Sequence, residues 1–269
     1  MASPDVIDVS NITFAEKLGE GGFAVVHRAV FTKPYKGHTE TAAKSVNNDL
    51  LKEEVEVMKQ LNHPHIVEFL GVYEKGPTTI ILLEYAPNGT LRQYLAKDPS
   101  VTPVPEDLLR RWAKESSLAI QYLHERKFLH RDIKAPNCLL FQDNLLKLSD
   151  YGMSRKFNRS LTTSSTKGTY GHMAPEIIRT NYADRSLFSV YSDIYAYGML
   201  LLEIVTRKPP FDGIEPQAIV FRVGRNNLKP DIPLECPDDL ADLMFECWDI
   251  DPRSRPTIQQ VLTITNPTK

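Results

Sequence analysis

The spacing of apolar residues changes at residues 84–90. Before this stretch, short segments rich in β-branched residues alternate with turns, which is typical of a β-sheet. After it, apolar residues recur every three or four positions over longer segments, which indicates helices. A chain of 269 residues is long enough for two lobes. The pattern therefore predicts an α+β chain, with a small β-rich lobe, a larger helical lobe and a ligand site in the cleft between them.

The expected elements follow this division. Strands are expected at residues 12–18, 24–31, 41–46, 66–73 and 79–84. One helix interrupts them: Asp49 can cap it, and its apolar positions are Leu51, Val55, Met58 and Leu61. Further helices are expected at residues 106–126, 191–206, 240–248 and 257–263. The first of these carries a buried stripe made of Leu109, Trp112, Ala113, Ser116, Ala119, Ile120 and Leu123.

Charge and cysteine content exclude several classes of protein. A net charge of −2 gives no reason to expect nucleic acid as a partner. The cysteines Cys138, Cys236 and Cys247 lack disulfide or zinc spacing, which favours a reducing compartment. The N-terminus has no signal-peptide core, and the longest apolar run, 194–202, is far shorter than the ~18 residues of a membrane span. We expect a cytoplasmic chain, with nuclear access possible and no membrane insertion.

The stretch LGEGGFAVVHRA, residues 18–29, allows two structural interpretations. Three glycines within four positions can form an ordinary hairpin turn, or a backbone cradle for phosphate groups. Lys44, on a later strand, could reach phosphate oxygens held by such a turn, although a lone strand lysine is usually just solvated. Glu54 lies 10 residues further on, close enough in the chain to fix that ammonium group.

The stretch FLHRDIKAPNCLLFQDNLLKLSDYG, residues 128–152, carries the strongest chemical signal. Asp132 and Asn137 could be simple turn formers, and Asp150 could end a strand. Together with Lys134, however, they supply what phosphoryl transfer requires: a proton-accepting carboxylate, hard oxygen ligands for Mg²⁺ and a cation near the transferred phosphate.

These motifs, in this order, resemble the catalytic domain of eukaryotic protein kinases from about Phe14 to Leu262. The stretches that carry the resemblance are GEGGFAVV, AAKSV, EEVEVM, LNHPHIV, LLEYAPNGTL, HRDIKAPN, DYG, GTYGHMAPE, SDIYAYG and CWDIDPRSRP. The resemblance implies a bilobal kinase fold, with an antiparallel N-lobe sheet, one key helix and a mainly helical C-lobe. It implies a single catalytic domain over residues 1–269, with an N-lobe at 12–84, a hinge at 85–90 and a C-lobe at 91–265.

The resemblance also implies a role for each matching residue. Asp132 would be the catalytic base, Lys134 would neutralise phosphate charge, and Asn137 and Asp150 would hold Mg²⁺. Lys44 would bind the α/β-phosphates of ATP and pair with Glu54. The remaining nucleotide-binding residues would be Leu18, Gly19, Glu20, Gly21, Gly22, Phe23, Ala24, Val26, Ala42, Leu83, Glu84, Ala86 and Leu139. Away from the nucleotide, Asp193 would lie beneath His130, and Glu176 would form a buried ion pair with Arg255.

The sequence departs from the family pattern at several positions. Ala24 replaces a glycine of the phosphate loop, where the chain re-enters a strand and a small residue with negative φ should fit. Tyr151 replaces the phenylalanine of the DFG motif. The connection from Lys44 to Glu54 is short for the family. His172 stands where related sequences often have an aromatic residue, and we expect it to be a surface histidine with no switch role.

Substrate and regulation follow from the same motifs. Lys134 and Thr169 fit the serine/threonine pattern, whereas LLEYAPNGTL and CWDIDPRSRP resemble the tyrosine-kinase-like branch near mixed-lineage, Raf and leucine-rich-repeat kinases. The expected activity is transfer of the γ-phosphoryl group of Mg-ATP to serine or threonine of protein substrates. The alternatives are a dual-specificity or tyrosine kinase, or a weakly active nucleotide-binding scaffold. Activation is expected through an upstream kinase or self-association, by phosphorylation at one of Thr162, Thr163, Ser164, Ser165 and Thr166.

Overall fold

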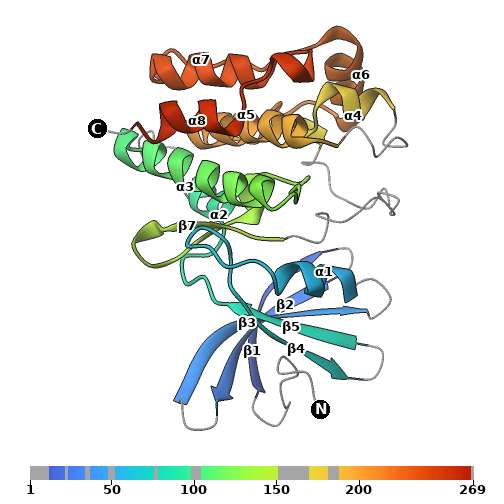
Figure 1. The fold of residues 1–269 in the computed structure, drawn as a ribbon, viewed down its shortest axis with the longest axis vertical. Helices are drawn as coiled ribbons and strands as arrows, with labels where there is room; N and C mark the ends of the chain where they lie inside the picture. Colours follow the sequence, from blue (N-terminus) through green and yellow to red (C-terminus); the bar gives the residue numbers. More distant parts are fainter. Residues whose placement is uncertain are drawn as a thin grey trace. The chain divides into compact units, whose positions relative to one another are not determined.

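The chain divides into two compact units, Met1–Pro87 and Asn88–Lys269. A computed structural model describes residues 12–21, 24–33, 37–47, 52–75, 78–97, 104–150, 170–180 and 188–267 (Figure 1). In this described part, no helix combines the length and the apolar character needed to cross a membrane. The cysteines Cys138, Cys236 and Cys247 are buried free thiols. Burial raises the pKa of all three, that of Cys236 to about 11, so they stay protonated at neutral pH.

The first unit is built on an antiparallel five-stranded sheet with strand order β1-β2-β3-β5-β4. Its strands are β1 (Ile12–Gly21), β2 (Ala24–Lys33), β3 (Gly37–Asn47), β4 (Phe69–Lys75) and β5 (Thr78–Glu84). The expected strand at 66–73 was misplaced at its start. The backbone N–H of Ile66 bonds to the carbonyl of His63 in a turn that contains Pro64. Pairing with β5 begins only at Phe69, and its register shifts between Phe69 and Gly71.

The two faces of this sheet have different characters. Ala29, Phe31, Ala43, Ile80 and Leu82 share one face and form a buried apolar cluster. Because side chains alternate along a strand, the residues between them belong to the other face. That other face carries the candidate nucleotide-binding positions Val26, Ala42, Lys44 and Leu83.

Helix α1 (Lys52–Met58) interrupts the strands, as expected, and buries Val55 and Met58. The helix ends at Met58. Leu61, which was expected to belong to it, is buried in the following turn instead, where its N–H bonds to the carbonyl of Met58.

The second unit is mainly helical. The long helices α3 (Glu106–Glu125) and α5 (Val190–Thr206) pack against each other, and α5 also contacts α7 (Asp238–Cys247) while α3 contacts α8 (Ile258–Thr265) (Figure 1). The predicted stripe of α3 is confirmed. Each of its predicted residues is buried, because apolar positions three and four apart share one face of a helix.

A short hairpin places two candidate site residues side by side. Strand β6 (Cys138–Leu140) pairs antiparallel with β7 (Leu146–Leu148), and Cys138 lies opposite Leu148. Asn137 immediately precedes β6, and Ser149 and Asp150 immediately follow β7. The N–H of Ser149 donates to the carbonyl oxygen of Asn137 at 2.8 Å, so the hairpin joins the two segments at its base.

Three shorter helices were not predicted: α2 (Leu91–Ala96), α4 (Pro175–Arg179) and α6 (Pro216–Asn226). Helix α2 begins at Thr90, whose hydroxyl accepts from the N–H of Gln93 while the Gln93 side chain accepts from the N–H of Thr90. This capping box sets the start of a helix only six residues long, too short to show a helical repeat.

Candidate active site

Three of the expected catalytic residues lie together in one loop of the second unit. The carboxylate oxygen Oδ2 of Asp132 is 2.8 Å from Nζ of Lys134 and accepts a 2.8 Å hydrogen bond from Nδ2 of Asn137. The same Asn137 nitrogen donates to the backbone carbonyl of Asp132 at 2.7 Å. The three side chains therefore hold one another in place. A short 3₁₀ turn, Ala135–Asn137, returns the chain so that Asn137 faces Asp132.

This loop is anchored by Asp193 of α5, which is almost fully buried. Oxygen Oδ2 of Asp193 accepts from the N–H of His130 at 2.9 Å, and Oδ1 accepts from the N–H of Arg131 at 2.8 Å. The ring of His124 in α3 lies 2.9 Å from Oδ2. Burial alone would raise the pKa of Asp193, but the bonds from His124 and Arg131 outweigh it, so the pKa is lowered and the carboxylate is charged.

Asp193 thus lies beneath His130, as the resemblance implied. The His130 ring is fully buried and bonds through Nε2 to the carbonyl oxygen of Ser149 at 2.9 Å. This contact connects the loop that carries Asp132 with the segment that leads into Asp150. Asp150 itself is exposed, with φ 63°, a left-handed conformation that aspartate tolerates better than most residues.

In the first unit, several expected nucleotide-binding residues share one face of the sheet. Lys44 on β3 lies opposite Val26 on β2, and Ala42 lies opposite Leu83 on β5. Directly paired residues point to the same side of a sheet, as do residues two apart in one strand. The register therefore gives Val26, Ala42, Lys44 and Leu83 a common face, opposite the buried apolar cluster. Glu84 ends β5, and its N–H bonds to the carbonyl of Glu68.

The glycine-rich stretch forms a hairpin. Strands β1 and β2 pair antiparallel, with Gly19 opposite Val26 and Gly21 opposite Ala24. Ala24 is the first residue of β2 and does not have positive φ, as expected for a residue where the chain re-enters a strand. The pairing register shifts near Leu18, and the Glu20 carboxylate pairs with Lys17.

The remaining expected residues are placed as follows. Leu139 lies in β6, where it pairs with Lys147, and Ala86 follows β5. The backbone of Glu54 belongs to α1, but its side chain is outside the described residues, as are Gly22, Phe23, Tyr151, Thr169 and the candidate phosphorylation sites at 162–166. Within the described residues, no cluster of three or more His, Cys, Asp and Glu could hold a metal ion.

The predicted ion pair between Glu176 and Arg255 is confirmed. Nη1 and Nη2 of Arg255 donate to the two carboxylate oxygens of Glu176, each at 2.8 Å, in the bidentate geometry that favours arginine. The same side chain donates to the backbone carbonyls of Tyr191 and Asp249. These contacts tie α4 to the start of α5 and to the segment that follows α7.

The expectation that His172 is a surface residue was wrong. Its side chain is only 5% exposed, and Nε2 lies 3.0 Å from Oε2 of Glu203 in α5. Glu203 was missed as well. A sequence signal existed: it is a carboxylate within the otherwise apolar run MLLLEIV, and a buried charge requires a partner.

Comparison with known proteins agrees with this architecture. A family model described as protein tyrosine and serine/threonine kinase matches residues 12–264. The chain belongs to this family, whose members generally use ATP and Mg²⁺. The bilobal kinase fold predicted from the motifs is thereby confirmed, with its antiparallel N-lobe sheet and helical C-lobe.

Similar proteins include mitogen-activated protein kinase kinase kinases. The chain is 36% identical to mitogen-activated protein kinase kinase kinase 12 of Rattus norvegicus, over 87% of its own length and 25% of that protein. It is 33% identical to mitogen-activated protein kinase kinase kinase 10 of Mus musculus, over 96% of its own length and 28% of that protein. The chain therefore spans about a quarter of the curated relatives it matches. These relatives agree with the predicted resemblance to tyrosine-kinase-like, mixed-lineage kinases.

Proposed function

We propose that the chain is a protein serine/threonine kinase that transfers the γ-phosphoryl group of Mg-ATP to protein hydroxyl groups. The observation that carries this proposal is the contact of Lys134 and Asn137 with the carboxylate of Asp132, in a chain that belongs to the kinase family. The order of the motifs along the chain supports the same assignment.

Asp132 would orient the substrate hydroxyl and accept its proton. Its Oδ2 is engaged by Lys134 and Asn137, so the second oxygen, Oδ1, is the atom that would face the hydroxyl. The Lys134 ammonium lies close enough to the carboxylate to offset negative charge where the phosphoryl group is transferred.

Asn137 and Asp150 would hold Mg²⁺. The amide nitrogen of Asn137 bonds to Asp132, which leaves its side-chain oxygen to point away from that residue. An amide oxygen and an exposed carboxylate at the base of one hairpin are the hard oxygen ligands that Mg²⁺ prefers. When bound, Mg²⁺ would neutralise phosphate charge.

Nucleotide binding by the first unit is also part of this proposal. The shared sheet face gives Lys44 apolar neighbours in Val26, Ala42 and Leu83, which suits a purine base close to its phosphates. The pairing of Lys44 with Glu54, the backbone contacts of Glu84 and Ala86 with adenine, and the contact of Leu139 with the base remain predictions. So do the contacts expected from residues 18–24.

The test is phosphate incorporation from ATP into casein and into the chain itself. Asp132→Asn should lower kcat by about a thousand-fold or more, because the proton acceptor is lost while the shape is retained. Asp143→Asn, at an exposed turn of the same unit, should retain activity. Nucleotide binding without phosphate transfer by the wild-type chain would support the scaffold alternative instead. Phosphoamino-acid analysis of the product separates serine and threonine from tyrosine.

We further propose that the substrates include MAP kinase kinases, because the names of the relatives describe kinases that act on such proteins. A catalytically inactive MAP kinase kinase should be phosphorylated in preference to casein. Equal rates on both substrates would contradict this assignment.

Activation by phosphorylation within residues 162–166, by an upstream kinase or after self-association, remains a prediction, as does a cytoplasmic location. Replacing all five hydroxyl residues by alanine should lower activity, and full activity in that variant would refute the prediction. Mass-spectrometric mapping of the autophosphorylated chain would identify the modified residue.

A further inference from the structure

The chain contains a single Asn-Gly pair, Asn88–Gly89, which begins the second compact unit. Gly89 has φ 71°, a left-handed conformation, and a Cβ added there would collide with Oε1 of Gln93. The fold therefore requires glycine at this position. Glycine is also the residue that shields a preceding asparagine least, because it has no side chain beside its backbone nitrogen.

The side chain of Asn88 joins this segment to the β6–β7 hairpin. Its Nδ2 donates to the carbonyl oxygen of Phe141 at 2.8 Å and to Oδ1 of Asn144 at 3.1 Å. The backbone pairs with the same hairpin: the N–H of Asn88 donates to the carbonyl of Leu140 at 3.1 Å, and the N–H of Leu140 donates to the carbonyl of Gly89 at 2.8 Å. The Asn88 amide nitrogen thus faces two oxygen acceptors, which an amide satisfies and a carboxylate would not.

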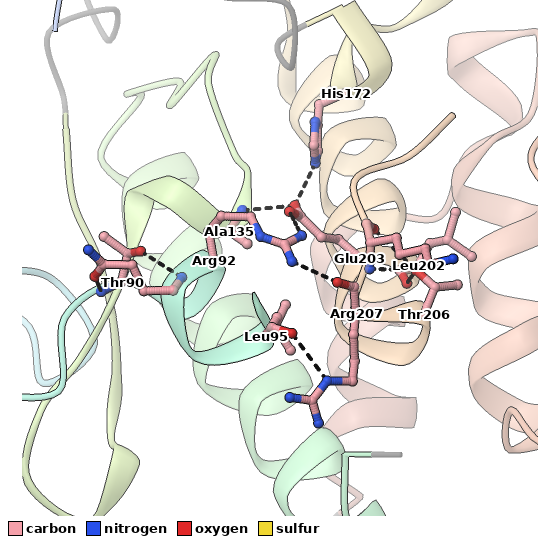
Figure 2. Close-up of polar contacts among 11 residues, drawn as sticks. Thr90, Arg92, Leu95, Ala135, His172, Leu202, Glu203, Thr206 and Arg207 are labelled. Carbon is pink, nitrogen blue, oxygen red and sulfur yellow. Dashed lines mark hydrogen bonds and ion pairs between the residues drawn. The ribbon is translucent and has the colours of Figure 1, made fainter. Parts of the chain in front are cut away.

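The chain beyond Gly89 is held by helix-to-helix contacts. Thr90 begins α2 with its capping box. Arg92 of α2 donates from Nη1 to Oε1 of Glu203 at 3.1 Å and from Nη2 to the carbonyl of Arg207 at 2.7 Å (Figure 2). The Arg207 side chain in turn donates to carbonyl groups at the end of α2. Helix α2 is therefore fixed to α5, and it cannot shift to absorb a change in the length of the chain at Asn88.

We propose that Asn88–Gly89 is a site of spontaneous covalent modification, at which the Asn88 amide is converted into an acid. In the part of the chain that the structure describes, the N–H of Gly89 donates to no partner, and Asn88 is exposed to water. The Gly89 nitrogen bonds to Cγ of Asn88 and gives up its proton, while the bond from Cγ to Nδ2 breaks and that nitrogen leaves with the proton as ammonia. Water then opens the cyclic imide at either carbonyl, which gives aspartate or isoaspartate.

Either product releases this segment from the hairpin. Aspartate would place a carboxylate oxygen against the carbonyl of Phe141 and Oδ1 of Asn144, where a donor was before. Isoaspartate would also insert a further carbon atom into the backbone, beside the paired bonds of Leu140. Because α2 is fixed, the added length would displace Asn88 itself from β6. The modification is independent of the proposed kinase activity.

The first experiment incubates the wild-type chain at mildly alkaline pH and maps the conversion of each asparagine over time by peptide mass spectrometry. Asn227 is the control in the same sample: it is exposed, its side chain accepts from Arg179, and the N–H of the following Leu228 is bonded to a carbonyl. Asn88 should be converted about ten-fold faster or more, because a leucine shields Asn227 and its backbone nitrogen is engaged. Conversion of Asn88 no faster than that of Asn227 would overturn the proposal.

A second comparison tests the contacts of the Asn88 amide. Its Nδ2 must leave its two oxygen partners before it can depart, so the rate should depend on Asn144. Asn144→Gly removes one acceptor and tolerates the φ of 56° at that position, and it should raise the rate about three-fold. Asn144→Asp offers a charged acceptor and should lower the rate about three-fold. Equal rates in both variants and the wild type would overturn the inference that this contact governs the site.

A third measurement tests the release of the segment. Anion exchange separates the converted chain, which carries an added negative charge, from the unconverted chain. Deuterium exchange at the Leu140 amide, which donates to the Gly89 carbonyl, should be about ten-fold faster after conversion. The Leu146 amide of the same hairpin donates to Glu115 instead, so its exchange should be unchanged. Unchanged exchange at Leu140, or equal acceleration at Leu146, would contradict the release. None of these results depends on phosphate transfer.

Discussion

At the scale of single residues, Asp193 shapes the candidate catalytic loop from outside it. Its carboxylate accepts hydrogen bonds from the backbone N–H groups of His130 and Arg131. Arg131 has a left-handed backbone conformation, with φ 68°. Left-handed backbone at a residue other than glycine costs roughly 1–2 kcal/mol. The bond from the Arg131 N–H to Asp193 offsets this cost, so the position of the following Asp132 depends on a residue of α5.

Asp193→Asn should therefore lower the free energy of unfolding by about 2–4 kcal/mol, because a buried N–H and the His124 ring lose a charged acceptor. Urea unfolding followed by circular dichroism measures the change. The exposed residue Asp231 provides the control, since Asp231→Asn should change stability by less than about 0.5 kcal/mol. Equal stability of the two variants would show that Asp193 has no anchoring role.

The sequence predicted the residues of the candidate catalytic loop better than it predicted the distant residues that hold this loop in place. Asp132, Lys134 and Asn137 lie within one short stretch, so their proximity follows from the chain itself. Glu203 is 111 residues from Arg92, 68 from Ala135 and 31 from His172, and no local pattern encodes such distant partners. His172 was assigned to the surface for this reason, since its burial depends on α5.

At the scale of elements, the close packing of α5 against the end of α7 depends on a missing side chain. A Cβ added at Gly198 would lie 2.6 Å from Cβ of Cys247 and 2.8 Å from Nε1 of Trp248. Both neighbours are buried, so neither can move into solvent. The glycine permits a close approach between two helices.

Gly198→Ala should be destabilising, although alanine is better than glycine within a helix by about 1 kcal/mol. The clash should outweigh this preference and lower the free energy of unfolding by about 1–3 kcal/mol. Thermal unfolding would measure it. At Gly19 an added Cβ meets nothing within 4 Å, so Gly19→Ala should be nearly neutral. A stabilised Gly198→Ala variant would contradict the argument.

The elements that were predicted well are the long ones. The expected helices at 106–126 and 191–206 differ from α3 and α5 by a single residue at one end, because many periodic positions define them. Helices α2 and α4 have only six and five residues, and local capping rather than a repeated apolar pattern starts α2. The predicted start of β4 was wrong because Ile66 is held in a turn that contains Pro64.

At the scale of the whole molecule, buried carboxylates make stability depend on pH. The pKa values of Glu203 and Asp193 are lowered from their ordinary 4.5 and 3.8. Such groups stabilise the folded chain above the unfolded pKa, and this contribution is lost as the pH falls through the folded pKa. Burial raises the pKa of Glu115, so ionisation of this carboxyl group lowers the stability of the folded chain as the pH rises.

We expect the free energy of unfolding to begin falling near pH 4.5 and to fall further below pH 3.8. Urea titrations at about pH 7 and about pH 4 would measure the loss. Glu203→Gln, which no longer titrates, should lose less stability between these two conditions than the wild type does. An identical loss in both would exclude Glu203 as a source of the pH dependence.

The central place of β3 in the sheet also has a consequence for how the chain opens over time. This strand has a hydrogen-bonded neighbour on each side, whereas β1 and β4 form the edges. An amide hydrogen exchanges with deuterium only when its bond opens, and edge strands open more readily than central ones. Exchange should therefore label β1 and β4 early and residues 42–44 late. The lysine proposed to hold the phosphates would then belong to one of the slowest-opening segments of its unit.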